Sequence, residues 1–387
     1  MKIIDIKVDI IGDSVDTDPD KGGVEPLAIV RIYTNEGIVG LSESFRVPPG
    51  VALAVMNGKD SFLGSRLIGQ TLSHPERLWQ LLYDSILHYN RRGWITMCIG
   101  ALDIAVWDIY GKMMQQPIYE LLGGIQRSFF QHSASSPTVE AVPYCTIVSE
   151  KWDCEDMICS QIERALLLKD LGYRGFKVEP MMSSIENTIA LARRAREALG
   201  PDVMLAVDVG YRFNDVNSAL KVCREIEEYD IYFFETPFPV DSFETYKSLA
   251  KRTDIPLAMG EHSVGRSEAV QMIKYGDVSV IQSYISTGGG LTEAKRLVAS
   301  ATDLGAMYIP GNWSTQLLGA ATVHLALFST VTPYYEFAPA EIFDSDLRQE
   351  IQNLGLPVVN GAVHPPTTPG LGIEIPQSLI DRFRIDG

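Results

Sequence analysis

The amino-acid sequence predicts an α/β protein, namely a (β/α)8-type TIM barrel modified to (β/α)7β, together with an N-terminal α+β capping domain. Two observations lead to this prediction. From about residue 142 onward, short apolar strands alternate with amphipathic helical segments, which is the pattern of a parallel barrel. Three of these strands end in an acidic residue, Asp208, Glu235 and Glu261, at gaps of 27 and 26 residues. Each gap is close to the length of one strand-plus-helix unit.

Residues 1–130 are expected to form the capping domain. The segments KIIDIKVDII and LAIVRIYTNEGIVGLSESF are strand-like, and Asn35-Glu36-Gly37 predicts a hairpin turn within the second one. From about Leu63 to Leu122 the pattern is helical. Within this stretch, residues 99–108 are small or apolar on most sides, which predicts a buried helix. Gly123-Gly124 is expected to end the helical region.

Residues 131–345 are expected to form the barrel, and residues 346–387 to return to the capping domain. The predicted strands are VPYCTIV, RGFKVE, VMLAVD, IYFFE, PLAMGE, VSVIQ, AMYIP and PYYEF. Helical segments lie between them, which gives eight strands and seven helices, the count for a barrel whose last helix is lost or altered. The tail GLPVVNGAVHPPTTPGLGIEI is rich in Pro and Gly and is not expected to complete the barrel.

Composition and charge exclude several functional classes. The net charge of −16 argues against nucleic acid or an anionic membrane surface as a partner. A small anionic substrate is not excluded, since a local cation or metal can reverse the field inside a cleft. We find no uncharged apolar run of about 18 residues, and the N-terminus is typical of a first strand rather than a signal peptide. The five Cys lack a metal-binding spacing, so a reducing cytoplasmic location is expected.

The three strand-end acids predict a metal site. A carboxylate at the tip of each of three successive parallel strands places six oxygens around one point. Hard divalent cations such as Mg²⁺ take oxygen ligands and leave coordination positions open for a substrate. Unrelated acids on the rim of a barrel are common singly, but these three occupy equivalent positions in consecutive units. Asp208, Glu235 and Glu261 are therefore predicted to bind Mg²⁺.

Further motifs carry a resemblance to a known family. They are the segment ALDIAVWDIYGK at residues 101–112, Pro117 followed by Leu121-Leu122-Gly123-Gly124, and the turn GGGLTEA at residues 288–294. With the strand-end acids, these motifs resemble the mandelate racemase and muconate lactonizing branch of the enolase superfamily, which includes acid-sugar dehydratases. The resemblance covers nearly the whole chain. It implies a shared first step, in which a base removes the proton α to a carboxylate and Mg²⁺ stabilises the enediolate.

The residues that usually transfer the proton depart from the family pattern. Lys177 matches the first lysine of a Lys-x-Lys pair, which holds the substrate carboxylate, whereas Glu179 stands where the second lysine acts as a base. Tyr284 stands in place of the customary Asp at the end of strand six. Gly311 stands in place of the customary His at the end of strand seven. The resemblance therefore implies an intact metal site with atypical catalytic bases.

Three interpretations of these departures remain open. In the first, other groups transfer the proton, either Lys177 with a lowered pKa beside the metal or Tyr284 as a phenol–phenolate pair. In the second, Glu179 is the base, although a carboxylate with an ordinary pKa near 4 is a weak one. Glu179 would otherwise become an additional metal ligand or support one. In the third, the protein binds an anionic ligand without turning it over.

Other candidate site residues follow from the same alignment. His262, next to Glu261, is a candidate acid or hydroxyl donor, or a rim histidine bonded to a neighbouring loop. Glu336 matches an acid that bonds the substrate carboxylate and supports the enediolate. Asn312 and Trp313 are expected to line the substrate pocket, although simple packing explains Trp313 equally well.

Cations near the barrel mouth have two interpretations. Arg212 offers a fork for a second substrate carboxylate, or it is a solvated loop residue. Arg91-Arg92 present cations to the cleft, or they lie solvated on a helix surface. In proteins that the chain resembles, two loops of the capping domain fold over the barrel mouth. The matching segments are Ile11–Glu25, whose many acids disfavour a dicarboxylate, and Phe45–Val51, which contains Arg46.

The sequence thus predicts a Mg²⁺-dependent lyase. It would abstract the proton α to the carboxylate of a hydroxylated sugar acid and eliminate water through an enediolate. Alternatives are a racemase, epimerase or cycloisomerase of the same branch, or a catalytically inactive acid-binding homologue. The expected partner is a small-molecule carboxylic acid, and family habit favours a symmetric homo-oligomer.

Overall fold

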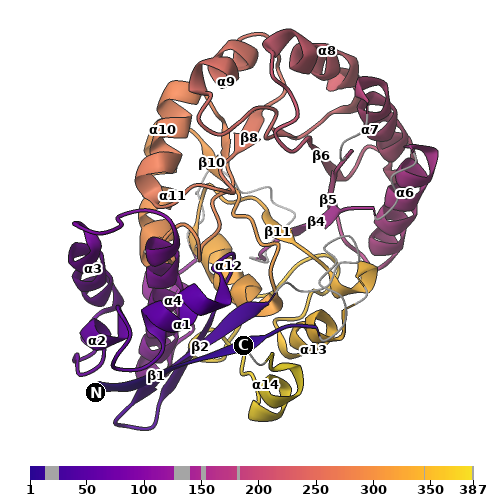
Figure 1. Cartoon of the computed structure of the whole chain (residues 1–387). Coiled ribbons are helices and arrows are strands. Elements are labelled where there is room, and N and C mark those ends of the chain that lie inside the picture. The colour runs from indigo at the N-terminus through magenta and orange to yellow at the C-terminus, as the bar shows by residue number, and fades with distance from the viewer. Residues whose placement is uncertain (14–25, 126–139, 150–153, 181–183, 344, 386–387) are drawn as a thin grey trace.

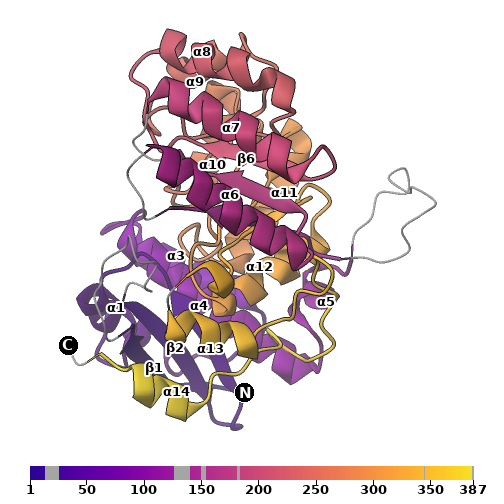
Figure 2. The same cartoon turned by 90° about the vertical axis from the view of Figure 1, so that its right-hand side faces the viewer.

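The computed structural model describes residues 1–13, 26–125, 140–149, 154–180, 184–343 and 345–385. It contains an antiparallel sheet of three strands and a parallel sheet of eight strands (Figure 1). The predicted barrel and α+β cap are confirmed. The expected border between them at residues 130 and 131, and most of the first predicted cap loop, lie outside the described residues. In Figure 2 the barrel lies above the capping domain, with α13 (Asp346–Leu354) and α14 (Gln377–Phe383) beside the latter.

The capping domain consists of a meander followed by helices. Its elements are β1 (Ile3–Ile11), β2 (Leu27–Thr34), β3 (Val39–Ser44), α1 (Pro49–Met56), α2 (Gly64–Leu67), α3 (Pro75–Ile86), α4 (Trp94–Met114) and α5 (Ile118–Leu122). The predicted hairpin turn joins β2 to β3, where Gly37 adopts a φ of +82° and donates its N–H to the carbonyl of Thr34. This left-handed conformation is one that glycine adopts without a steric penalty.

The barrel alternates strands and helices as predicted. Its strands are β4 (Pro143–Ile147), β5 (Gly175–Val178), β6 (Met204–Asp208), β7 (Phe234–Glu235), β8 (Leu257–Met259), β9 (Val280–Ile281), β10 (Met307–Tyr308) and β11 (Tyr335–Phe337). The helices between them are α6 (Cys154–Asp170), α7 (Ile185–Leu199), α8 (Val216–Ile226), α9 (Phe243–Ala250), α10 (Arg266–Gly276), α11 (Leu291–Leu304) and α12 (Gln316–Phe328). Short 3₁₀ turns, η3 (Glu227–Tyr229) and η4 (Ala340–Ile342), follow α8 and β11.

The sheet curls so that its first and last strands meet. β11 pairs in parallel with β4, and β10 lies at the other end of the ladder. Two backbone hydrogen bonds connect the β10 end of the sheet to the β11 end. The N–H of Glu336 donates to the carbonyl of Pro310, and the N–H of Tyr308 donates to the carbonyl of Val331. Buried side chains on the barrel strands and next to them form an apolar cluster of their own. This cluster includes Tyr144, Phe233 and Ile309. The strand tips can therefore hold a site above a packed interior.

Helix α4 is the buried helix that the sequence predicted. Among the described residues it is the one helix long and apolar enough to cross a membrane, and 78% of its apolar window is buried inside the protein. It packs on the cap sheet on one side and on the barrel on the other. Gly100 permits the second contact, since a Cβ there would lie 2.0 Å from the carbonyl oxygen of Ser286. A helix covered on both sides has no polar face.

Two carboxylates of α4 fix the cap to the rest of the chain. Asp103 accepts hydrogen bonds from the N–H and hydroxyl of Thr292, at 2.8 and 2.7 Å, and so caps the start of α11. Asp108 accepts the N–H groups of Leu41 and Leu371 and pairs with Lys112 at 2.8 Å. Both acids therefore have a structural role, one as a helix cap and the other in an ion pair.

The C-terminal segment runs back along the capping domain. The N–H of Ile385 donates to the carbonyl of Ile10, and the N–H of Gly12 donates to Phe383. Arg384 pairs with Asp9 on β1 at 2.8 Å. The end of the chain therefore closes over the first strand.

Replacing Asp103 by Asn tests this cap–barrel contact. Burial raises the pKa of Asp103 from 3.8 to about 7, although the donors of Thr292 act in the opposite direction. Between about pH 4 and about pH 7 the folded protein keeps a proton that the unfolded chain has lost, so the free energy of unfolding falls as pH rises. We expect Asp103→Asn to remove this contribution, which amounts to at most about 4 kcal/mol at ~1.4 kcal/mol per pKa unit.

Urea unfolding at several pH values across that window measures the effect. Asp202→Asn, in an exposed turn, serves as the control and should keep the pH dependence of the unmodified protein. Equal pH slopes for Asp103→Asn and the unmodified protein would contradict the assignment.

Candidate active site

A cavity of about 380 Å³ opens at the carboxyl ends of the barrel strands. This is where enzymes built on such barrels place their active sites. Five carboxylates and two cations are among its lining residues, which are Arg46, Val148, Ser149, Lys177, Glu179, Asp208, Val209, Gly210, Glu235, Glu261, Gln282, Tyr284, Gly311, Trp313 and Glu336. All lie on the barrel except Arg46, which the capping domain supplies.

Strand register brings the charged groups together. Asp208 is the Cα partner of Glu235 across the β6–β7 ladder, so the two carboxylates leave adjacent strands at the same height. Glu261 follows β8 two residues after Met259. Lys177 and Glu179 are two residues apart at the end of β5 and therefore face the same side of the sheet. The sequence-based expectation that these residues converge is met by the fold.

Lys177 lies at the centre of the acidic group. Its Nζ is 2.9 Å from Glu235 Oε2, 3.1 Å from Glu336 Oε1 and 3.3 Å from Asp208 Oδ2. The side chain is only 3% exposed. The ammonium group of Lys177 thus links β5 to the ends of β6, β7 and β11.

The charge state of Lys177 follows from these contacts. Burial disfavours the ammonium, but the carboxylates of Glu235 and Glu336 outweigh burial and hold the pKa of Lys177 well above its ordinary value. The interpretation in which Lys177 is a base with a lowered pKa is therefore not supported by its protein neighbours. Lys177 is a cation that can hold an anionic group.

Asp208 and Glu235 have further donors that fix their orientation. Oδ1 of Asp208 accepts the hydroxyl of Thr236 at 2.8 Å and the N–H of Gly210 at 2.9 Å. Oε2 of Glu235 accepts an N–H of Gln282 at 2.8 Å. Burial, followed by the charge of Asp208, raises the pKa of Glu235 well above its ordinary value, and Lys177 opposes this only in part. A further cation at this point would relieve the repulsion between the two acids.

Glu261 is held from three sides. Both terminal nitrogens of Arg46 lie 3.2 Å from its Oε2, and the hydroxyl of Tyr211 donates to Oε1 at 2.7 Å. Nε2 of His262 is 3.5 Å from Oε1. Burial would raise the pKa of Glu261, but Arg46 and Tyr211 more than offset it, so the pKa is lowered. This carboxylate is ionised over the physiological range.

Three of the non-glycine residues with a positive φ lie beside the same carboxylates. Arg46, Tyr211 and Thr236 adopt φ values of +58°, +60° and +45°. Non-glycine residues are uncommon in this region, and a β-branched residue there is an outlier. Such strain persists where the surrounding structure holds a functional arrangement in place.

The donor chemistry fits a hard divalent cation. Asp208, Glu235 and Glu261 offer only oxygen atoms, and the carboxylates of the lining outnumber its cations. As the side chains stand, no three acidic, His or Cys residues in the described part of the chain form a ready metal cluster. Lys177 lies between two of the expected ligands, and Arg46 holds the third. A bound cation would compete with these two groups.

Glu179 is the carboxylate with the fewest partners in the cavity. Its side chain is 23% exposed, and the one ion pair that it makes with another described residue, Lys177, is long at 3.9 Å. Its backbone is fixed, since its N–H donates to Oε1 of Gln161 at 3.0 Å. Burial and the charge of Asp208 raise the pKa of Glu179 well above its ordinary value. The objection that Glu179 is too weak a base assumed an ordinary pKa, which its protein neighbours do not give it.

Glu336 is surrounded by donors. Its Oε1 accepts the hydroxyl of Thr146 at 2.6 Å and contacts Lys177. Its Oε2 accepts the N–H of Asn312 at 2.8 Å and faces the hydroxyl of Tyr284 at 3.4 Å. Glu336 therefore reaches the cavity as the sequence predicted.

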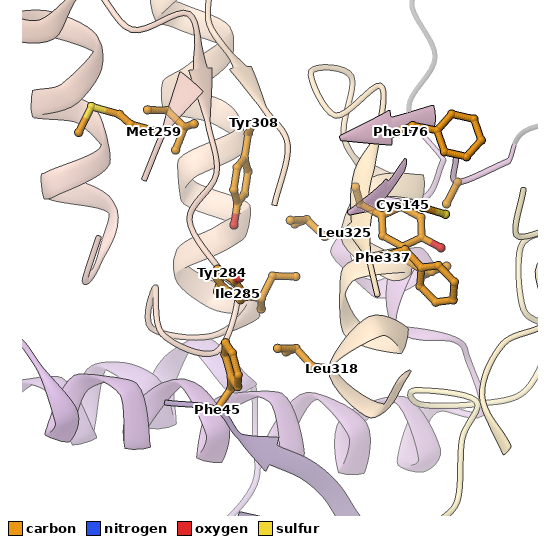
Figure 3. Close-up of a cluster of buried hydrophobic side chains, with 14 of the residues drawn as sticks. Phe45, Cys145, Phe176, Met259, Tyr284, Ile285, Tyr308, Leu318, Leu325 and Phe337 are labelled. Atoms are coloured by element: carbon orange, nitrogen blue, oxygen red, sulfur yellow. The ribbon is translucent and has the colours of Figure 1, made fainter. Parts of the chain in front are cut away.

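Tyr284 fills the space beside Gly311, and these are the two residues that the sequence indicated as departures from the family pattern at strands six and seven. A Cβ added to Gly311 would lie 2.6 Å from Cε2 of Tyr284, so no side chain fits at residue 311. From the cap, Phe45 packs against Tyr284 with ring centres 5.2 Å apart (Figure 3), and the guanidinium of Arg46 lies 5.1 Å from the ring. Burial and the charge of Glu336 raise the pKa of Tyr284 well above its ordinary value. Tyr284 is therefore a neutral phenol, which opposes the phenol–phenolate interpretation.

Of the remaining predicted residues, one lines the cavity and three do not. Trp313 lines the cavity and packs edge-on against Phe343. Asn312 is buried and contributes its N–H to Glu336, but it is not among the lining residues. His262 is 49% exposed, stacks on Tyr211 and also lies outside the lining. Arg212 donates to Thr188 on α7 and likewise lies outside it. For Asn312, His262 and Arg212 direct substrate contact is not supported.

Some important contacts were not found from the sequence. Thr146 and Gln282 bond Glu336 and Glu235 through side chains that no spacing rule singles out. The contact of Arg46 with Glu261 joins residues 215 positions apart. The only sequence feature that pointed to this contact was the position of Arg46 in a loop of the capping domain that was expected to fold over the barrel mouth.

Comparisons with known proteins agree with this geometry. Residues 160–379 match the family described as enolase C-terminal domain-like, and residues 20–123 match the mandelate racemase / muconate lactonizing enzyme N-terminal domain. The chain belongs to the enolase superfamily. It is an enzyme of the mandelate racemase and muconate lactonizing branch, whose members are lyases and isomerases.

Named relatives extend over almost the full length of the chain. Arabinonate dehydratase of Saccharolobus solfataricus is 31% identical over 381 residues, covering 97% of this chain and 95% of that protein. D-galactarolactone cycloisomerase of Agrobacterium fabrum is 27% identical, covering 92% and 91%. The crystal structure of the 3,6-anhydro-D-galactonate cycloisomerase from Zobellia galactanivorans superposes with a TM-score of 0.86 at 27% identity, covering 100% of both chains.

Substitution of Gly311 tests its close contact with Tyr284. We expect Gly311→Ala to lower the free energy of unfolding by about 1–3 kcal/mol, the usual effect of overpacking. Adding Tyr284→Ala should remove most of the extra loss, because the clash disappears with the ring. Chemical denaturation of the two single variants and the double variant measures the coupling.

Gly50→Ala is the matched control, since a Cβ at residue 50 meets nothing within 4 Å. It should leave stability almost unchanged. Strictly additive effects of Gly311→Ala and Tyr284→Ala would contradict the steric argument.

Proposed function

We propose that this enzyme is a Mg²⁺-dependent lyase that removes the α-proton of a hydroxylated sugar acid and then eliminates water from the β-position. The observation that carries the proposal is a cavity at the strand ends in which a buried cation, Lys177, lies among carboxylates while one carboxyl, Glu179, remains lightly bonded and has a raised pKa. The acid-sugar dehydratase among the relatives supports the same reaction class.

Asp208, Glu235 and Glu261 would hold the Mg²⁺ ion in this proposal. The ion would act as an electrophile that withdraws electron density from the substrate carboxylate and so acidifies the α-carbon. Arg46 and Lys177, which contact the three acids, are then available to the anionic substrate.

Lys177 would orient the substrate carboxylate. Its neighbours keep it charged, and a buried ammonium attracts an anion far more strongly than an exposed one does. Tyr284, as a neutral phenol, can donate a hydrogen bond to a substrate oxygen but does not supply a proton readily. Both groups position the substrate and stabilise charge without themselves changing protonation.

Glu179 would carry the proton. As a carboxylate it would take the α-proton, and as the resulting carboxylic acid it would return that proton to the departing β-hydroxyl, which leaves as water. The enol that remains becomes a 2-keto-3-deoxy acid. A raised pKa suits both steps, because proton transfer is most efficient for a group whose pKa lies near the working pH.

The charge of the lining favours a monocarboxylate. Acids exceed cations in the cavity, so a second substrate carboxylate would face repulsion unless a further cation were present. Arg212, expected as a fork for such a group, bonds to Thr188 instead. An aldonic acid fits this balance better than an aldaric acid.

Cycloisomerisation is the second candidate. It is favoured by the two cycloisomerases among the relatives and by the lack of a side chain at Gly311, where the customary His is replaced. Proton return to carbon would then replace loss of water.

A substrate screen with Mg²⁺ distinguishes the candidates. Aldonates, aldarates and sugar-acid lactones are incubated with the enzyme, and 2-keto-3-deoxy acids are measured. Product from an aldonate supports dehydration, whereas an isomerised product of unchanged mass supports the second candidate. If no compound reacts and none exchanges its α-proton with deuterated solvent despite proven binding, the enzyme proposal fails.

Glu179→Gln tests the proton-transfer role. We expect kcat to fall by about 10²–10⁴-fold, the usual contribution of a general base. The kcat of the unmodified enzyme should rise with pH through the raised pKa of Glu179, because only the ionised form accepts the proton. Glu225→Gln, on the exposed face of α8, is the control. Full activity in Glu179→Gln would remove Glu179 from the mechanism.

Titration calorimetry tests the metal site separately from turnover. We expect Mg²⁺ to bind the chelator-treated protein with a one-to-one ratio, and Asp208→Asn to weaken binding at least tenfold because an anionic oxygen ligand is lost. Asp202→Asn should bind Mg²⁺ like the unmodified protein. Absence of Mg²⁺ uptake with and without candidate acids would refute this site.

A further inference from the structure

A second cavity, of about 200 Å³, lies between the capping domain and the barrel. Its cap wall comes from α3, the loop before α4 and the first turn of α4. Its barrel wall comes from the start of α10 and from α11. Among the described residues it shares no lining side chain with the active-site cavity.

Four arginines line this second cavity. Arg91 and Arg92 come from the cap, and Arg266 and Arg296 come from the barrel. Arg91 is exposed and has no ion-pair partner within the described ranges. The Nε atoms of Arg92 and Arg266 are buried without a hydrogen-bond partner in the same part of the chain. Guanidinium groups from both domains therefore meet at this cavity, and some of their N–H groups have no hydrogen-bond partner among the described residues.

The acids beside the cavity are already bonded. Glu293 accepts from Arg296 at 3.0 Å through Oε1 and from the N–H of Arg266 at 3.3 Å through Oε2. Glu268 accepts from Arg92 and, with its other oxygen, from the N–H of Val264. Oε2 of Glu293 also lies 3.9 Å from Nε of Arg266, so each of these two carboxylates already contacts a guanidinium.

The same holds for the third acid of the group. Glu76 pairs with Lys295 at 3.0 Å and with Arg296 at 3.6 Å. Asp84 bonds to Gln80 rather than to any of the cations. Five cations thus stand against three acids that contact them, in a chain whose net charge is −16. This is a local reversal of the protein's field.

We propose that this cavity binds a phosphoryl group, either as inorganic phosphate or on a small sugar phosphate. Guanidinium groups match phosphate oxygens with paired hydrogen bonds. The volume is below the ~300 Å³ at which sites for larger ligands begin, which restricts the ligand to a small one. Trp79 and Tyr83, stacked with ring centres 4.9 Å apart, supply an apolar wall. The site is independent of the proposed lyase reaction.

Calorimetric titration of the full-length protein tests the proposal. Inorganic phosphate and glucose 6-phosphate are the probes, and glucose is the uncharged control. We expect saturable binding of at least one phosphoryl compound, weakened at least about tenfold by Arg91→Ala and by Arg266→Ala. Arg193→Ala, on the exposed face of α7, is the matched control and should bind normally. Tighter binding of glucose 6-phosphate than of phosphate would identify the sugar phosphate as the source.

Three results would overturn the proposal. One is no saturable binding of either probe up to about 10 mM, above the ~1 mM scale of weak affinity. The second is that Arg91→Ala and Arg266→Ala both bind the probes as tightly as the unmodified protein does. The anion would then bind elsewhere, for example beside Lys177. The third is equal weakening by Arg193→Ala, which would indicate diffuse surface attraction. If Arg266→Ala fails to fold, Arg91→Ala decides, because Arg91 is exposed and unpaired among the described residues.

Discussion

Lys177 brings a positive charge into a place that water hardly reaches, and acids from the tips of β6, β7 and β11 are arranged around it. A buried ion is tolerated only when its hydrogen-bonding capacity is used, and here Glu235, Glu336 and Asp208 share that task. Removal of Lys177 would leave these three carboxylates without their shared cation. The mouth of the barrel is therefore a single electrostatic unit, in which burial and the charge of Asp208 raise the pKa of Glu235 and of Glu179.

The capping domain completes this unit rather than merely covering it. Arg46 balances Glu261, and Phe45 packs against Tyr284. Farther from the cavity, Glu43 on β3 accepts hydrogen bonds from the backbone and hydroxyl of Thr315 in the barrel. Because the cap is also fixed through Asp103 and Asp108 on α4, the position of Arg46 depends on contacts distant from the cavity. Cap and barrel thus share one site.

Near the ends of β9 and β10, the side chain at residue 284 limits the side chain that residue 311 can carry. Tyr284 fills the volume above Gly311 so closely that a side chain at one residue excludes a side chain at the other. The phenol is neutral and its hydroxyl faces Glu336, so this end of the cavity presents a hydrogen-bond donor. At the β5 end, the ion pair between Glu179 and Lys177 is long, at 3.9 Å, and the role of Glu179 as the proton carrier is our proposal.

The sequence by itself determined the barrel, the cap, the buried helix α4 and the strand-end places of Asp208, Glu235 and Glu261, because period, turn residues and strand spacing are local properties of the chain. It also indicated that Lys177, Glu179 and Glu336 face the same cavity. Only the tertiary structure decided the charge state of Lys177, the contact of Arg46 with Glu261 and the positions of Arg212 and His262 outside the lining. Burial and charge–charge interactions arise between residues far apart in the chain, and no local pattern records them.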